Sequence, residues 1–205
     1  MKNSKMLLVT YKLFFALLGF AALITEIAVI SERGIFNAGN FFSFFTVQIN
    51  ILAFVTFLMS AFVVAGGKDR RWLDILRSVT AVYILVVGIG FAVLLAGLEG
   101  VALTAVPWDN TVLHYIIPIA VLLDFLLDRP KRKIAFKSGL LWISYPILYV
   151  AYSLIRGPIV GWYPYPFLNP TINGYSGVLV PVLGLVVLGV VLIWIVTRLT
   201  GKTKH

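Results

Sequence analysis

A threonine and a histidine stand out in this apolar sequence because their side chains can act together on an ester. Thr46 lies in "FFSFFTVQINILAF" and His114 lies in "NTVLHYIIP". A neutral imidazole can take the proton of a hydroxyl that attacks a carbonyl carbon, and can then return it to the leaving group. The amides of Asn50 and Asn110 could orient this imidazole or stabilise the oxyanion. Ser43, one turn before Thr46, is the alternative nucleophile.

Further polar side chains fall within the hydrophobic stretches. An ionisable group inside a membrane span is costly and by default marks a functional site. We expect Arg156 to hold a substrate carboxylate and to pair with Glu26 when the site is empty. Tyr152 continues a stripe with Tyr145 and Tyr149 at helical spacing, which predicts a polar face turned into a bundle.

Other chemistry is excluded by residues that the sequence lacks. It has no cysteine, and it has no G-x-S-x-G, H-E-x-x-H, Walker or Rossmann pattern. We therefore expect no metal site and no cofactor. Asp124 is expected to pair with Arg129 or Lys131, and no lysine is expected in the membrane core, which excludes a retinal-type Schiff base.

The elements that must position these residues are predicted to be membrane helices. The 205 residues are 60% hydrophobic and 12% charged, whereas soluble domains are about half apolar and a quarter charged. Backbone groups in lipid must be satisfied within the protein, so the hydrophobic stretches should be helices. The prediction is one all-α domain, residues 1–205, with spans near 6–30, 42–65, 78–98, 110–127, 139–156 and 176–197.

The distribution of the net charge of +9 predicts the topology. All Lys and Arg except Arg33 and Arg156 fall near the N-terminus, in or beside the turns 66–71 and 128–137, or in the C-terminal tail. By the positive-inside rule, both termini and both basic turns face the cytoplasm in a multi-pass protein of the cell membrane. Anionic lipid is the partner of this charge, so we expect no nucleic acid.

This topology brings the polar residues to one depth. Thr46 and His114 each lie about one turn inside the outer surface, roughly 6 Å deep at the rise of an α-helix. Glu26 and Arg156 lie near the outer ends of their own spans. Pro118 shares a stripe with His114 and leaves the carbonyl of His114 without its helical donor, so an irregular helix is expected there.

Three stretches of this sequence resemble a known family. They are "FFTVQINIL" (44–52), "VLHYIIPIAVLLDFLL" (112–127), and "YPILYVAYSLIRG" with "WYPYPFLNP" (145–157 and 162–170). Over nearly its whole length the chain is similar to the androgen-induced-protein-like family of six-helix membrane proteins, in its bacterial branch. Animal members are threonine hydrolases that cleave fatty acid esters of hydroxy fatty acids. The resemblance implies Thr46 as nucleophile and His114 as base.

A membrane lipid ester fits the predicted depth of the reacting layer, because its acyl chains lie in the membrane while the ester lies near the headgroups. The segment 157–174 is either a lid over the pocket or an interfacial anchor. Two other classes stay open. One is a small transporter or channel with a relay of Glu26, His114 and Arg156, and the other is a membrane subunit without catalysis. The sequence predicts no oligomeric state.

Overall fold

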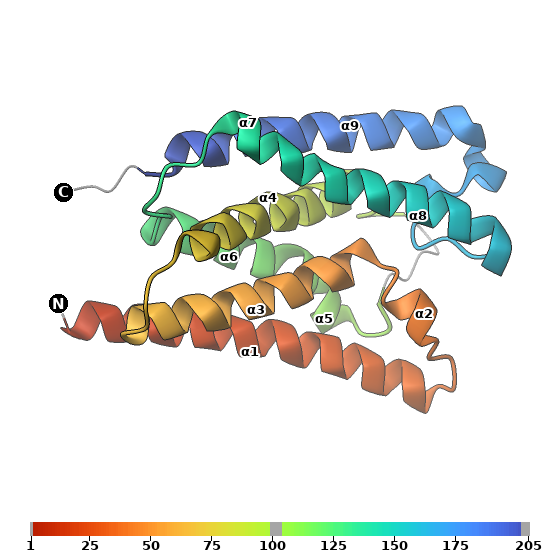
Figure 1. Cartoon of the computed structure of the whole chain (residues 1–205). Helices are drawn as coiled ribbons and strands as arrows, with labels where there is room; N and C mark the ends of the chain where they lie inside the picture. The colour runs from red at the N-terminus through yellow and green to blue at the C-terminus, as the bar shows by residue number, and fades with distance from the viewer. Residues whose placement is uncertain (1, 99–103, 202–205) are drawn as a thin grey trace.

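The protein is a bundle of helices whose axes run in roughly the same direction (Figure 1). The computed structural model describes residues 2–98 and 104–201, and within these ranges all regular structure is helical. Six helical segments are long and apolar enough to cross a membrane: Asn3–Glu32, Phe45–Ala65, Arg71–Leu94, Pro107–Leu127, Phe136–Val160 and Gly174–Leu199. The predicted all-α fold with six segments of spanning length is confirmed.

Three of the six segments are built from more than one element or contain a kink. The fourth combines α5, a π-helical turn η1 and α6, the fifth combines α7, a 3₁₀ turn η2 and α8, and α9 changes direction at Gly174 (φ 64°). The elements are α1 (Lys2–Glu32), α2 (Ala38–Phe41), α3 (Phe45–Ala65), α4 (Arg71–Leu94), α5 (Pro107–Thr111), η1 (Val112–Ile116), α6 (Ile117–Leu127), α7 (Phe136–Gly139), η2 (Leu140–Ile143), α8 (Ser144–Val160), η3 (Pro166–Leu168) and α9 (Pro170–Leu199).

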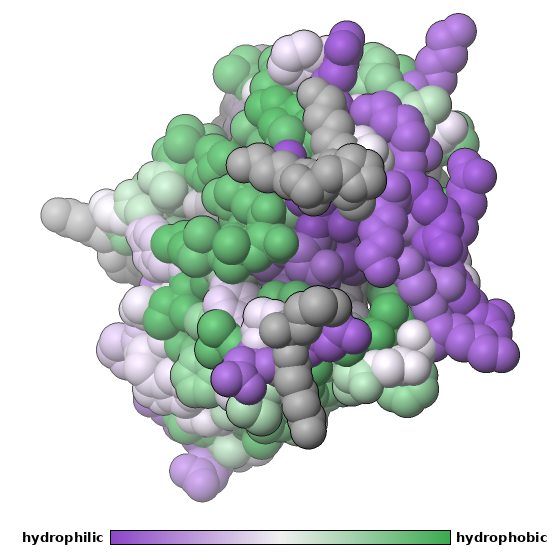
Figure 2. All heavy atoms as spheres, turned by 90° about the vertical axis from the view of Figure 1, so that its left-hand side faces the viewer, coloured by the Kyte–Doolittle hydropathy of each residue, from purple (hydrophilic) through white to green (hydrophobic). Residues whose placement is uncertain are grey.

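The two ends of the bundle differ in charge. Both chain ends lie together with the α3–α4 and α6–α7 connections, and we call this the basic end (Figure 1). Figure 2 looks onto it and shows hydrophilic side chains gathered over one half of the face. Exposed cations of the basic end are Lys5, Lys68, Arg70, Arg71, Lys131, Lys133, Lys137 and Arg198. The opposite end, with α2, α5 and η3, is called the site end.

The third spanning helix is longer toward the basic end than its hydrophobicity predicts. It begins at Arg71 rather than near 78, and it ends at Leu94 rather than near 98. Asp74 and Arg77 in its first two turns are buried, which hydropathy alone does not anticipate. Asp74 accepts hydrogen bonds from the main-chain N–H of Lys131 and from Arg132 Nη1, the latter at 2.9 Å, so the helix continues through it.

Two expectations about charged residues are wrong. One is that no lysine lies in the membrane core, and the other concerns the partners of Asp124. Lys12 of α1 is fully buried and pairs with Asp124 and, at 3.0 Å, with Asp128. Arg77 of α4 meets the same two carboxylates at 3.3 and 3.1 Å. Asp124 therefore pairs with Lys12 and Arg77, and not with Arg129 or Lys131.

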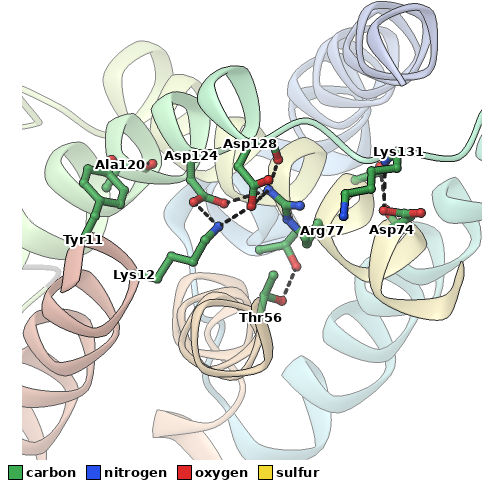
Figure 3. A network of polar contacts seen from close by, with 11 residues as sticks. Tyr11, Lys12, Thr56, Asp74, Arg77, Ala120, Asp124, Asp128 and Lys131 are labelled. Carbon is green, nitrogen blue, oxygen red and sulfur yellow. Dashed lines mark hydrogen bonds and ion pairs between the residues drawn. The ribbon is translucent and has the colours of Figure 1, made fainter. Parts of the chain in front are cut away.

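Figure 3 shows Lys12 and Arg77 approaching the two aspartates from α1 and α4. We call these four residues the four-charge cluster. Its two cations and two anions balance in charge, and each cation contacts both carboxylates, so none of the four charges lacks an opposite partner. The cluster joins three spanning segments near the basic end, away from Thr46 and His114.

Candidate active site

The side chains of Thr46 and His114 are in contact at the site end, although 68 residues separate them. Thr46 Oγ1 lies 3.3 Å from His114 Nε2, and both residues are buried. The other ring nitrogen, Nδ1, lies 3.1 Å from the main-chain oxygen of Asn110. A carbonyl only accepts, so Nδ1 carries the hydrogen and Nε2 accepts from the threonine hydroxyl. Phe91 of α4 stacks on the imidazole with ring centroids 4.0 Å apart.

The irregular helix expected before Pro118 is a π-helical turn. Proline has no N–H for the carbonyl of His114, and Val112–Ile116 is closed by a hydrogen bond from the N–H of Ile117 to the oxygen of Val112. Gly88 of α4 packs against this turn, where a Cβ would come within 3.2 Å of His114 O. Such turns are frequent at functional sites, and this one carries the imidazole toward α3.

The two asparagines hold the site in ways that the sequence does not predict. Asn50 Nδ2 donates to the main-chain oxygens of Thr46 at 2.9 Å and Leu113 at 3.3 Å, so it joins α3 to η1. Asn110 holds His114 through its main-chain carbonyl and not through its amide. The expectation that the asparagine side-chain amides orient the imidazole is therefore wrong for these two residues.

Tyr165 completes the site, and its role is not predicted by the sequence. Its hydroxyl accepts a hydrogen bond from the N–H of Thr46 at 3.0 Å and lies 3.1 Å from Thr46 Oγ1. Because the proton of Thr46 is directed to His114, Tyr165 donates its own proton to Thr46 Oγ1. Burial raises the pKa of Tyr165, so this hydroxyl stays protonated. The prolines on both sides of Tyr165, Pro164 and Pro166, are the sequence signal for a rigid placement.

Ser43 lies in a different environment from Thr46. Its hydroxyl donates to the main-chain oxygen of Gly39 at 2.5 Å and is 2.8 Å from the hydroxyl of Tyr152. Ser43 precedes α3, and within residues 2–98 and 104–201 its hydroxyl bonds to Gly39 and Tyr152 and not to His114. Tyr152 therefore supports the connection before α3. Of the hydroxyls of Ser43 and Thr46, only that of Thr46 has an imidazole partner.

Glu26 and Arg156 do not pair, which corrects the expected ion pair. Both carboxylate oxygens of Glu26 lie 2.9 Å from the main-chain N–H of Ala105. Arg156 donates to Asn40 Oδ1 at 2.7 Å and lies over the ring of Trp162. The three residues of the relay considered for a transporter or channel therefore do not lie together. Glu26 shares a cavity with His114, whereas Arg156 lies beside α2.

Two cavities meet at Thr46 and Tyr165. The small cavity, of about 40 Å³, is also lined by Glu26 and His114. The apolar cavity, of about 180 Å³, lies between α4, α8 and α9. Among residues 2–98 and 104–201, no group of three or more His, Cys, Asp or Glu is arranged to hold a metal ion.

Fold and composition define the class: six apolar helices of spanning length indicate a multi-pass membrane protein. Comparisons with protein-family models, with curated proteins and with solved structures found no match to this chain. The function must accordingly be argued from the site itself.

Proposed function

We propose that this chain is a membrane-embedded hydrolase of lipid esters, with Thr46 as nucleophile and His114 as general base. One observation carries the proposal: Thr46 Oγ1 lies 3.3 Å from a ring nitrogen whose partner nitrogen is held at 3.1 Å by the oxygen of Asn110. This arrangement supplies a nucleophile, a base in the required tautomer and a group that orients the base.

The reaction proceeds in two halves. Thr46 Oγ attacks the ester carbonyl carbon while its proton passes to His114 Nε2, and collapse of the tetrahedral intermediate breaks the carbon–oxygen bond to the alcohol. His114 returns the proton to the departing alcohol oxygen, leaving an acyl ester on Thr46. Water then attacks this ester, gives a proton to His114 and releases the fatty acid, and Thr46 regains its proton.

The developing oxyanion has donors nearby. Thr46 is in the first turn of α3, where main-chain N–H groups have no acceptor within the helix and the helix dipole favours negative charge. Tyr165, whose hydroxyl lies 3.1 Å from Thr46 Oγ1, can turn its proton to the oxyanion once that threonine oxygen has bonded to the acyl carbon. Fixed donors of this kind in a water-poor site stabilise the charge that forms in the transition state.

The small cavity has room for the water of the second half-reaction. Its volume of about 40 Å³ exceeds the ~10–15 Å³ that one water needs. Glu26 and His114 line it together, so an acceptor and the base both face the same space. Arg156, near the same end, is proposed to attract the carboxylate of an ester of a hydroxy fatty acid.

The proposed setting is the cell membrane, with the basic end in the cytoplasm and the site end outside. The cations of the basic turns support this orientation through the positive-inside rule. The resemblance to the androgen-induced-protein-like threonine hydrolases supports the same substrate class, fatty acid esters of hydroxy fatty acids.

Hydrolysis by purified full-length chain in lipid nanodiscs tests the proposal. The substrates are a fatty acid ester of a hydroxy fatty acid and, for labelling, a fluorophosphonate probe. We expect wild type to cleave and to be labelled, Thr46→Ala to lose both, and His114→Ala to lose at least about a hundredfold in rate. Ser43→Ala is the matched hydroxyl control and should keep its activity.

Thermal unfolding of each variant shows whether the bundle is intact. Equal cleavage by wild type and Thr46→Ala, with both folded, would rule out the proposed nucleophile. Loss in Ser43→Ala together with activity in Thr46→Ala would transfer that role to Ser43.

A further inference from the structure

The apolar cavity is elongated and follows the helix axes. Along α4 it is lined from Val82 to Leu94, and along α9 from Val182 to Ile193, about 17 Å at the rise of an α-helix. Thr46 and Tyr165 also line it. Phe91 lines it too and stacks on His114, so the part of the cavity beside Phe91 is level with the reacting groups. The cavity therefore extends from the candidate active site toward the basic end.

Chemically, the cavity is suited to a hydrocarbon. The two other tyrosines in its wall have their hydroxyls engaged elsewhere: Tyr83 donates to the main-chain oxygen of Trp142, and Tyr149 donates to that of Ser43. The hydroxyls of Thr46 and Tyr165 contact each other at the end near His114. A ligand of matching chemistry is apolar along its length and carries a polar group at that end.

The cavity is also placed where a lipid can reach it. Its wall includes Ile147 of α8, whose side chain is 53% exposed on the apolar surface of the bundle. Pro146 and Val150 of the same helix and Leu185 and Val186 of α9 line it as well. A hydrocarbon chain in the surrounding membrane thus has a short path between α8 and α9.

From these observations we infer that the apolar cavity binds the acyl chain of the scissile ester, with the carbonyl at Thr46 and the methyl end toward Ile193. This inference rests on the proposed hydrolase function and adds that the cavity selects ester substrates by the length of their acyl chain. The length of the cavity, about 17 Å at the rise of an α-helix, favours long-chain acyl groups over short ones. Because the empty cavity of about 180 Å³ is smaller than such a chain, side chains of its wall move apart when the chain enters.

Gly189 of α9 allows a direct test. It lines the cavity on the side of Ile193, and an added Cβ would have no heavy atom within 4 Å. Gly189→Leu therefore fills the far part of the cavity without a collision at its first atom. Gly184→Leu is the matched control, because Gly184 also has open space at its Cβ but is exposed and does not line the cavity.

The measurement is hydrolysis of para-nitrophenyl butyrate, octanoate and palmitate by the full chain in nanodiscs. We expect Gly189→Leu to lose about tenfold or more on palmitate relative to wild type while butyrate is cleaved as before, since a pocket discriminates by the methylenes it cannot hold. Gly184→Leu should follow wild type. If Gly189→Leu cleaves all three esters as wild type does, the inference is overturned although the hydrolase proposal stands.

A second measurement does not need turnover. The His114→Ala variant is irradiated with palmitic acid that carries a diazirine at its methyl end, and the modified residues are mapped by mass spectrometry. Modification around Gly189 and Ile193 that Gly189→Leu abolishes supports the acyl site even if no ester is cleaved by wild type. Modification confined to lipid-facing residues such as Val187 would mean a bilayer lipid only, and would overturn the inference.

Discussion

The hydroxyl of Tyr165 contacts both the main chain and the side chain of Thr46, at 3.0 Å from the N–H and 3.1 Å from Oγ1. Through this pair, the segment between α8 and α9 reaches the first turn of α3. Tyr165 is buried, and its neighbour Leu168 in η3 is buried as well. The segment accordingly covers the threonine, as a lid would, and holds its hydroxyl toward His114.

Tyr165→Phe tests this role as a positioning group. The aromatic ring keeps its packing, but Thr46 loses one hydrogen-bond donor. We expect the hydrolysis rate to fall by roughly tenfold to a hundredfold with little change in KM, because the lost bond acts on the transition state. The matched control is Tyr163→Phe, two residues earlier, which should change the rate by less than about twofold. A rise in KM with an unchanged kcat would instead make Tyr165 a binding residue.

Gly157→Ala should disturb the same segment from α8. An added Cβ would lie 2.0 Å from Cε1 of Tyr163, closer than any packed contact, so the ring and the chain leading to Tyr165 must move. We expect a loss of about 1–3 kcal/mol in the free energy of unfolding and a lower rate. Gly184→Ala, whose Cβ meets open space, is the control for thermal unfolding. Helix propensity alone predicts that Gly157→Ala raises the free energy of unfolding. Such a gain would contradict the close packing of Gly157 against Tyr163.

Lys12→Met should destabilise the bundle without touching the candidate active site. It leaves the buried Asp124 and the half-buried Asp128 with Arg77 as their only cation in the four-charge cluster. Removing one partner of a buried ion pair costs about 3–5 kcal/mol in the free energy of unfolding. Lys137→Met, at an exposed lysine of the basic end, should change it little.

The double variant Lys12→Met with Asp124→Leu separates charge balance from packing. Arg77 and Asp128, which lie 3.1 Å apart, then remain as a neutral pair. We expect the double variant to regain most of the stability lost by Lys12→Met, measured by chemical unfolding in detergent. No recovery would indicate that Lys12 stabilises the bundle by contacts other than its ion pairs.

The basic end should lose stability in acid through Asp69. Burial raises the pKa of Asp69, the contacts with Lys131 and Arg132 lower it, and the net pKa is below its usual value. A carboxyl with a lower pKa in the folded state stabilises folding above its unfolded pKa, and this contribution is lost as the pH falls through the folded pKa. Thermal unfolding of Asp69→Asn should therefore depend less on pH than that of wild type in the acidic range. An Asp69→Asn variant with the same pH dependence as wild type would contradict this assignment.

Composition and periodicity were enough to predict the helical class and the six spanning segments, because the absence of water in lipid leaves the backbone few alternatives. They also placed Thr46 and His114 at one depth, since depth follows from the helix rise and from where a span begins. Composition and periodicity did not predict which charged side chains are buried. Lys12 reads as part of a basic N-terminus, although in the fold it is a fully buried partner of Asp124.

By itself, then, the sequence predicted six apolar spanning segments and a common level along the bundle for Thr46 and His114. Tertiary structure alone decided which side chains touch: Thr46 with His114, Tyr165 with Thr46, and Arg156 with Asn40 instead of Glu26. The physical reason is that depth depends on local sequence, whereas adjacency depends on how helices rotate and pack against one another. A bond such as that from His114 to the main-chain oxygen of Asn110 also depends on backbone geometry, which residue type does not encode.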